Sequence, residues 1–507
     1  MFKKIDIAGL SFAKTASVLF LITLAVKILG LFREILMAAY IGMNQSTDAY
    51  NIAILAASII TGIAGIAIGS SLIPVLASIA SEKGEEEQEQ FFSNVFWTLM
   101  IIAFVSAGIV YVFAVPVIKV LAPGFDEATV RLSANLFQIG FIKINAIVAA
   151  ALFTQYLNYK NCFYSPMIAA SIGTVVLVGY FIVVRNFANV STLMMMTVIT
   201  YVIQMLWMVP ALVRNGFRLR LYWNLKDPNL ISFFSLALLA VFNYLAQQIG
   251  IMVNRGLASQ LTVGSISALN YANSIVMMIN MTVSLSIATV IYPRLAEALS
   301  KKSMEMAIAI FRQGILLASI LLLPALVGLI LLAAPISAAL FERGLFTADN
   351  TAMTAQALCG YSIGIIAYAF YELSSRFFYS MKDTKTPMMA AFAGVLTMIM
   401  LSFWLYKPLE LLGLSLSTSA MQIVMAVILL AIINYKNEEI FNKELLVKIL
   451  IVTISALTMG LVLFSVRNII IIPPLGGVMD LTFKIIFAIC VYTGSLHFFS
   501  CKNGYKT

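Results

Sequence analysis

Long apolar runs follow one another along the whole chain and are separated by short polar stretches. Most runs approach the roughly 20 apolar residues that an α-helix needs to cross a bilayer, and they lack the strict alternation of a membrane β-strand. We therefore predict an all-α polytopic membrane protein with about fourteen transmembrane helices. The expected helices cover approximately 16–42, 49–79, 93–121, 130–158, 164–185, 191–213, 229–258, 265–293, 306–340, 352–380, 387–407, 412–434, 445–467 and 478–500.

Lysine and arginine gather in every second connection between these runs. Because positive charge accumulates in cytoplasmic loops, this asymmetry predicts that both termini are cytoplasmic. The basic connections, taken as cytoplasmic, carry Lys83, Lys160, Arg214, Arg218, Arg220, Lys226, Arg294, Lys301, Lys302, Lys382, Lys385, Lys436 and Lys443. The opposite connections carry only Arg185, Arg343, Lys407 and Arg467.

The chain also repeats itself at an offset of about 220 residues. The stretch PMIAASIG (166–173) corresponds to PMMAAFAG (387–394), and Pro74 corresponds to Pro293. Six segments in each repeat give both halves the same membrane topology, which is the parallel-repeat plan of alternating-access transporters. We predict an N-terminal lobe over 1–220, a C-terminal lobe over 221–436, and two extra helices over 437–507.

Composition excludes several classes of protein. The chain is 62% hydrophobic and 11% charged, a balance foreign to soluble domains, and its net charge of +10 is explained by loop charges rather than by nucleic-acid binding. The four cysteines show no metal-ligand spacing, and no nucleotide-binding loop or nucleophile motif appears. We expect no enzymatic activity and no cofactor, so transport would draw on the membrane potential or on a cation gradient.

The stretch from residue 27 to residue 53 carries the strongest candidate site. Lys27, Arg33 and Glu34 lie inside an apolar run, where a charge costs at least about 2.5–3.5 kcal/mol and normally faces a bundle interior or a wet cavity. The alternative is local, in that Lys27 extends toward the interface and Arg33 pairs with a nearby acid such as Asp48.

Further candidates lie at comparable depth in other runs. Arg255, which follows Asn254, would face Arg33 across the cleft between the repeats, and two guanidinium groups suit an anionic phosphate. An interfacial position for Arg255 is the alternative. Lys143 and Asn145 fall in the middle of the fourth run and are candidates for lining a cavity.

Several stretches resemble the bacterial lipid II flippase family, MurJ or MviN. They are KILGLFREILMAAYIG (27–42), TDAYNIA (47–53), LAPGFD (121–126), VIYPRLAE (290–297), LFERGLFTADNT (340–351) and YSMKDTKTPM (379–388). The resemblance implies a fourteen-helix member of the multidrug and polysaccharide exporter superfamily. It further implies transfer of the undecaprenyl-pyrophosphate-linked peptidoglycan precursor from the inner to the outer leaflet of the cytoplasmic membrane. The last two helices would form a lipid-facing groove.

The same resemblance assigns roles to residues. It matches Arg33, Glu34, Lys27 and Asp48 to family positions. With Arg255 added from its depth in the seventh run, we expect Lys27, Arg33 and Arg255 to hold the pyrophosphate, and Glu34 and Asp48 to order these cations or gate the outer side. The chain departs from the family where it has Ser274 in place of an arginine and Asn254 in place of an acid. Both residues remain candidates for lining the cavity.

Three hypotheses about function stay open on this basis. The first is a lipid II flippase, whose partners are the lipid-linked substrate and membrane lipids. The second keeps the transporter and changes its cargo to another polyprenyl-linked glycan, such as a teichoic acid or capsule unit. The third is a non-transporting scaffold that binds cell-wall synthesis proteins through the acidic loop 81–90 and the basic loop 214–226.

Overall fold

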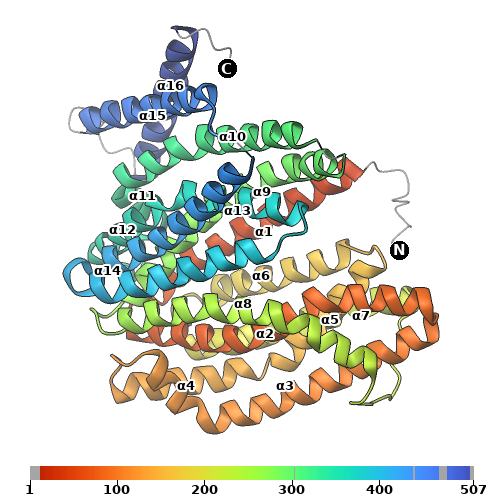
Figure 1. Cartoon of the computed structure of the whole chain (residues 1–507). Coiled ribbons are helices and arrows are strands. Elements are labelled where there is room, and N and C mark those ends of the chain that lie inside the picture. The colour runs from red at the N-terminus through yellow and green to blue at the C-terminus, as the bar shows by residue number, and fades with distance from the viewer. Residues whose placement is uncertain (1–11, 302, 438–439, 468–476, 503–507) are drawn as a thin grey trace. The chain divides into compact units, whose positions relative to one another are not determined.

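The computed structural model describes residues 12–301, 303–437, 440–467 and 477–502, and in these ranges it is built of helices without β-strands (Figure 1). This confirms the predicted all-α membrane fold. The first half contains α1 (Phe12–Tyr40), α2 (Gln45–Glu82), α3 (Glu85–Leu121), α4 (Glu127–Phe141), α5 (Ile144–Tyr159), α6 (Tyr164–Val184), η2 (Arg185–Phe187) and α7 (Val190–Arg214). The second half contains α8 (Pro228–Ala258), α9 (Ser265–Ser300), α10 (Met304–Leu331), α11 (Ala333–Phe341), α12 (Ala348–Ile363), α13 (Ile365–Ser380), α14 (Lys385–Asn437), α15 (Lys443–Arg467) and α16 (Gly477–Lys502).

The helix lengths accommodate the predicted number of membrane crossings. In the described part of the chain, 9 helices are long and apolar enough to span a bilayer, and two bent helix pairs raise the number to 11. The 53-residue α14 is too long for one crossing and contains a non-helical residue at Glu410, so it supplies two spans. The lengths of α1 and α9, 29 and 36 residues, also suffice for a crossing each.

Three of the expected helices are broken, which the apolar pattern did not predict. The run 130–158 divides into α4 and α5, which are bent by 41°, and the run 352–380 divides into α12 and α13, which are bent by 40°. The run 306–340 divides into α10 and α11 because Pro335 has no N–H group and its ring would clash with the carbonyl of Leu331, where α10 ends.

Packing divides the chain into two compact units. The first contains Met1–Ile41, Ala49–Leu121 and Phe125–Gln248, and the second contains Gly42–Asp48, Ala122–Gly124 and Ile249–Thr507. The division falls inside α8, and two short loops from the first half pack with the second unit. The predicted lobes over 1–220 and 221–436, with two extra helices over 437–507, stay a prediction.

In the first unit, α7 packs against α4, α5 and α6, while α1 packs along α6 and α3 contacts α4 and α5. An aromatic cluster of Phe92, Phe153 and Tyr156 with Phe217 closes one end of this unit, with ring centroids 5.1–5.8 Å apart around Phe217. The contacts of α7 with α4, α5 and α6 place α7 at the centre of the first unit. The same helix carries Thr197 and Tyr201.

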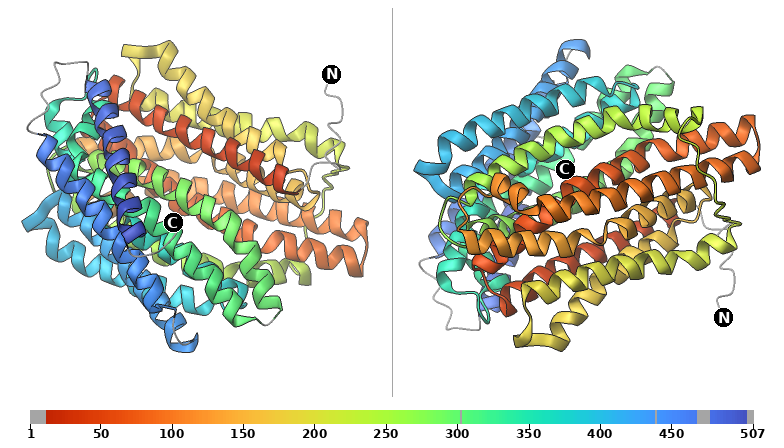
Figure 2. Two further views of the ribbon diagram at one scale, coloured as in Figure 1. Left: turned by 90° about the horizontal axis from the view of Figure 1, so that it is seen from above. Right: turned by 90° about the horizontal axis from the view of Figure 1, so that it is seen from below.

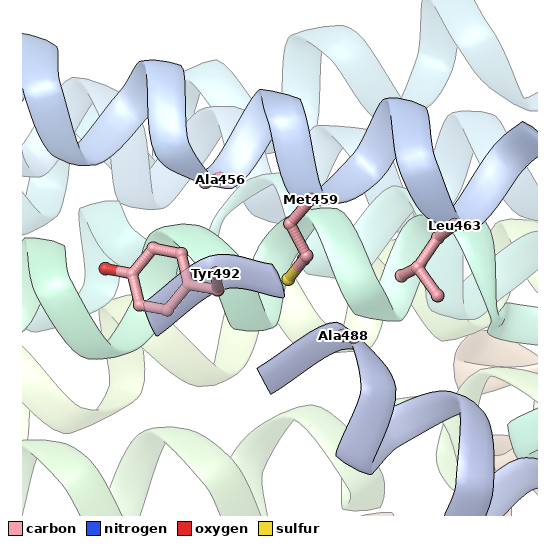
Figure 3. Close-up of a cluster of buried hydrophobic side chains, with 5 residues drawn as sticks. All are labelled: Ala456, Met459, Leu463, Ala488 and Tyr492. Carbon is pink, nitrogen blue, oxygen red and sulfur yellow. The ribbon is translucent and has the colours of Figure 1, made fainter. Parts of the chain in front are cut away.

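In the second unit, α9 packs against α10, α12 and α13, and α14 lies along α12 and α13. The last two helices cross each other at the C-terminal end of the chain (Figure 2) and pack on α10 and α11. Met459 and Leu463 point from α15 toward the part of α16 that carries Ala488 (Figure 3).

One hydrogen bond fixes α16 to α10 at a defect in α10. Pro324 lies inside α10 and has no N–H, so the carbonyl of Ile320, four residues earlier, lacks its usual helical donor. The hydroxyl of Tyr492 on α16 donates to that oxygen at 2.8 Å. A buried carbonyl in a membrane protein must find a donor within the protein, so this bond gives α16 a specific docking point.

Candidate functional site

Arg33 and Glu34 on α1 form an ion pair, Arg33 Nη2 donating to Glu34 Oε1. Glu34 is buried, whereas 37% of the Arg33 side chain is exposed. That Arg33 faces a bundle interior or a wet cavity stays a prediction. Its acidic partner is Glu34 and not Asp48, the local alternative that the sequence suggested. A guanidinium group has five donors, so the single carboxylate leaves others for a ligand.

Lys143 lies in the break between α4 and α5 and is buried at 7% exposure. Its Nζ donates to Thr197 Oγ1 at 3.4 Å and lies 5.2 Å from the centroid of the Tyr201 ring. Thr197 and Tyr201 both come from α7. Lys143 is thus held at membrane depth by a hydroxyl and an aromatic face, and its described contacts in the first unit include no carboxylate.

These groups form one electrostatic cluster in the first unit. Lys143 is close enough to Arg33 for the two cations to interact, and Tyr50 and Tyr201 interact with Arg33 in turn. With Glu34 ionised, the cluster of Arg33, Glu34 and Lys143 carries a net charge of one positive unit. We call these three residues with Tyr50 and Tyr201 the cation cluster. A positive site walled by tyrosines inside a helical bundle suits an anion that brings its own negative charge.

The other predicted residues of the first unit take no part in the described hydrogen bonds and ion pairs of the cation cluster. Lys27 is exposed on α1, two turns before Glu34, and Asn145 is half-buried in the first turn of α5. Sequence reasoning missed Tyr50 and Tyr201. Each is an isolated phenol in an apolar run, a signal too common to single out.

Asp48 belongs to the second unit, where it caps the N-terminus of α9. Its buried carboxylate accepts hydrogen bonds from Gly264 N at 2.7 Å, from Ser267 N at 2.8 Å and from Ser267 Oγ at 2.6 Å. Gly264 has a positive φ of 90°, a conformation that suits glycine, and packs against Met43. Asp48 therefore fixes the loop before α2 to the start of α9.

Arg255 is half-buried on α8, and its Nη1 is buried without a hydrogen-bond partner among the described residues. It is near enough to Asp48 for electrostatic attraction. Asn254, by contrast, is buried and donates to Leu414 O at 2.9 Å and to Ser402 Oγ at 3.3 Å, which ties α8 to α14. Ser274 is half-buried and donates to Asn270 O within α9.

The structure therefore brings the predicted residues together in two groups, one in each unit. Arg33, Glu34 and Lys143 form the first group, and Asp48 and Arg255 form the second. Asn254 and Ser274 are bonded to their own helical surroundings, as helix-packing residues are. Within the described residues, no group of three or more histidine, cysteine or acidic side chains has the arrangement of a metal site.

Comparison with known proteins decides the family. The family model described as Lipid II flippase MurJ matches residues 37–482, which is most of the chain. The chain belongs to the MurJ family.

Individual MurJ relatives share only a modest sequence identity with this chain, but the similarity extends over most of its length. A probable lipid II flippase MurJ of Buchnera aphidicola is 28% identical over 448 residues, covering 85% of this chain and 87% of the relative. The lipid II flippase MurJ of Burkholderia cenocepacia is 27% identical over 406 residues, covering 76% of this chain and 77% of the relative.

Solved structures support the fold. A lipid II flippase MurJ in an inward closed conformation superimposes with a TM-score of 0.81 at 23% identity, covering 96% of this chain and 99% of that chain. An inward-facing multidrug resistance MATE transporter of the MOP superfamily gives a TM-score of 0.66 at 14% identity, covering 82% of this chain and 95% of that chain. The MurJ fold of this chain is thus shared with a wider group of transporters.

Proposed function

We propose that this chain is a lipid II flippase that moves the undecaprenyl-pyrophosphate-linked peptidoglycan precursor across the cytoplasmic membrane by alternating access. Membership of the MurJ family supports this, as do relatives that bear the name lipid II flippase. The similarity of the fold to inward-facing and outward-facing MATE transporters supports an alternating-access cycle. We place both termini in the cytoplasm, on the basis of the charge asymmetry of the loops.

We assign the pyrophosphate of the substrate to the cation cluster, and this is the observation that carries the proposal. Arg33 offers guanidinium donors on its open side, and Lys143 adds a second positive charge from a different helix. Together they present more positive charge than Glu34 neutralises. Arginine recognises phosphate oxygens through paired hydrogen bonds, and lysine contributes a point charge.

The remaining predicted residues take supporting roles in this proposal. Glu34 orients Arg33, and Asp48 fixes the loop before α2 to the start of α9. Arg255 has a buried donor without a protein partner, so it is a second candidate for contact with substrate. Lys27, Asn145, Asn254 and Ser274 have no assigned contact with substrate in this scheme. The polyprenyl tail is assigned to the surface of α15 and α16.

The energy source is proposed to be the membrane potential or a cation gradient, since the sequence has no nucleotide-binding motif. Moving one elementary charge through 100 mV is worth about 2.3 kcal/mol. A net positive cluster that changes its exposure during the cycle would couple to that potential. Transport, rather than catalysis, is the expected activity.

Complementation tests this function directly. A bacterial strain depleted of its resident lipid II flippase should grow when it expresses this chain, and it should fail when it expresses the Arg33→Ala variant at equal abundance. Arg131→Ala is the matched control, because Arg131 is 71% exposed and pairs only with Glu127 one turn away. Failure of the wild-type chain to rescue, with accumulation of a different lipid-linked glycan in its native host on deletion, would favour the teichoic acid or capsule alternative.

A further inference from the structure

Residues 215–227 connect α7 to α8 at the protein surface, and we call this segment the strap. It begins directly after Arg214 at the end of α7 and ends before Pro228 at the start of α8. Since both helices are long enough to cross the bilayer, chain continuity places the strap at one membrane face. The charge asymmetry of the loops predicts that this face is cytoplasmic.

One side of the strap is fixed to the first unit by aromatic packing. The ring of Phe217 lies 5.2 Å from that of Phe92, 5.8 Å from that of Phe153 and 5.1 Å from that of Tyr156, each in an edge-to-face arrangement. Such pairs prefer this geometry and add to the burial of the rings. The first residues of the strap are thereby anchored.

Hydrogen bonds from α3 continue this attachment along the strap. Arg220 N donates to Ser93 Oγ at 3.0 Å, and Trp97 Nε1 donates to Arg220 O at 3.0 Å. The guanidinium group of Arg220 bonds Glu86 at 2.7 Å and Glu89 at 3.2 Å. The acidic and basic loops, which the sequence suggested as sites for protein partners, therefore pair with each other at these residues.

The far end of the strap is held by a reciprocal amide pair. Asn94 Nδ2 donates to Asn224 O at 2.8 Å, and Asn224 N donates to Asn94 Oδ1 at 2.8 Å. Asn94 also donates to the carboxylate of Asp227 at 3.3 Å. Asn94 thus holds the backbone of the strap beside α3 at Asn224.

The opposite side of the strap is apolar and uncovered. Leu219, Leu221, Trp223 and Leu225 occupy alternate positions, and their exposed fractions are 41%, 92%, 58% and 57%. Arg220 bonds α3 through its guanidinium group and Asn224 through its backbone, while a tight turn, in which Tyr222 N donates to Arg220 O at 3.0 Å, places Leu221 at its apex. The strap is thus attached to α3 through polar groups and leaves these four apolar side chains exposed.

Basic side chains flank the apolar face. Arg214, Arg218 and Lys226 are exposed, whereas the nearby acids Glu86 and Glu89 are engaged by Arg220. The apolar surface also continues into Val213 at the end of α7 and Ile231 at the start of α8, which are 65% and 59% exposed on membrane-spanning helices. The flanking basic residues and the continuation of the apolar surface onto membrane-spanning helices together indicate that a lipid surface covers the apolar side chains of the strap.

We propose that the strap is an interfacial anchor, which inserts Leu221, Trp223 and Leu225 into the leaflet and binds anionic phospholipid headgroups through Arg214, Arg218 and Lys226. Tryptophan favours the membrane interface, and each basic residue near an anionic surface strengthens binding by about fivefold. The anchor links the start of α3 and the junction of α7 with α8 to the plane of the membrane. The inference does not depend on which lipid-linked substrate is carried.

Spin labelling of the full-length protein in nanodiscs tests the anchor. The four cysteines (Cys162, Cys359, Cys490 and Cys501) are replaced by serine, and a nitroxide is attached at Leu221→Cys. Leu221 is nearly fully exposed, so the label should not disturb folding. Lys83→Cys, an exposed position at the end of α2 on the same membrane face, is the aqueous control. Accessibility to oxygen and to a water-soluble nickel chelate then reports depth in the bilayer.

We expect the label at 221 to be shielded from the chelate and accessible to oxygen in nanodiscs that contain phosphatidylglycerol, while the label at 83 stays accessible to the chelate. Pure phosphatidylcholine, or glutamine at positions 214, 218 and 226, should reduce this shielding. Equal exposure of both labels to the chelate would overturn the proposal. Shielding that disappears when each nanodisc holds a single copy of the protein would overturn it also, because a second protein copy would then cover the face.

Discussion

Asp48 and Ser267 are joined by two hydrogen bonds, the carboxylate accepting from both the backbone N and the hydroxyl of Ser267. Asp48 lies in the first turn of α2 and Ser267 in the first turn of α9, which are equivalent positions of the two sequence repeats. A carboxylate at a helix N-terminus gains from the free N–H groups and from the helix dipole. The first turns of two repeat-equivalent helices are therefore bonded to each other.

Asp48→Asn should weaken this connection because an amide has one acceptor oxygen where the carboxylate has two. We expect the free energy of unfolding to fall by about 1–3 kcal/mol and the rescue of a flippase-depleted strain to be reduced. Thermal unfolding in detergent and growth rescue measure the two effects. Asp349→Asn is the control, since Asp349 also lies in the first turn of a helix, α12, but is exposed. Equal effects of the two substitutions would refute the role of Asp48.

Lys143→Met should abolish transport without unfolding the protein. Methionine fills a similar volume, and removal of a buried charge without a carboxylate partner should leave stability unchanged or increase it. The measurement is the translocation rate of fluorescent lipid II in proteoliposomes, together with the melting temperature. Lys119→Met, at an exposed position on α3, should leave both unchanged. A wild-type rate in Lys143→Met would exclude Lys143 from the substrate site.

Gly364→Ala should strain the bend between α12 and α13. An added Cβ would lie 2.3 Å from Gln422 Oε1 and 2.8 Å from Ser419 Oγ on α14. Overpacking of this kind costs about 1–3 kcal/mol. Gly328→Ala in α10 is the matched control, because nothing lies within 4 Å of its Cβ and alanine is the better helix former. Thermal unfolding should separate the two variants, and similar melting temperatures would show that the close packing at Gly364 is unimportant.

Tyr492→Phe should loosen α16, because it removes the donor that satisfies the Ile320 carbonyl beside Pro324. We expect a cost of about 1–2 kcal/mol, visible as faster hydrogen exchange in α16. Tyr435→Phe, which is 90% exposed, is the control.

A double-mutant cycle gives the sharper version of that test. Pro324→Ala restores an N–H to α10, so Tyr492→Phe should cost less in that background than in the wild type. Additive effects of the two substitutions would contradict the explanation given for the bond.

The membrane-spanning helices could be predicted from the sequence, because the length of an apolar run largely determines whether it crosses the bilayer. Arg33 and Lys143 could be singled out in the sequence for a related reason, because a positively charged residue within an apolar run is rare. Glu372 and Arg376 lie four residues apart on α13 and form an ion pair at 3.6 Å, a pairing that this spacing alone predicts.

Other features depend on tertiary contacts that no local pattern specifies. The sequence suggested Glu34 and Asp48 alike as acids that order Arg33, and the choice of Glu34 depends on the tertiary structure, because neighbours in a helix point about 100° apart. The contact of Lys143 with Thr197 joins residues 54 apart in sequence. The alternation in RLRLYWNL (218–225) was visible in the sequence. That its apolar side chains stay exposed is recognisable only once the hydrogen bonds between the strap and α3 are seen.

Binding of lipid II to the purified protein in nanodiscs tests the central claim most directly, with undecaprenyl monophosphate as the comparison ligand. The account predicts that the wild type prefers lipid II, that Arg33→Gln and Lys143→Met each raise the Kd for lipid II by about 10-fold to 100-fold, and that the preference disappears in the double variant. A Kd for lipid II that is unchanged in the folded double variant would contradict it.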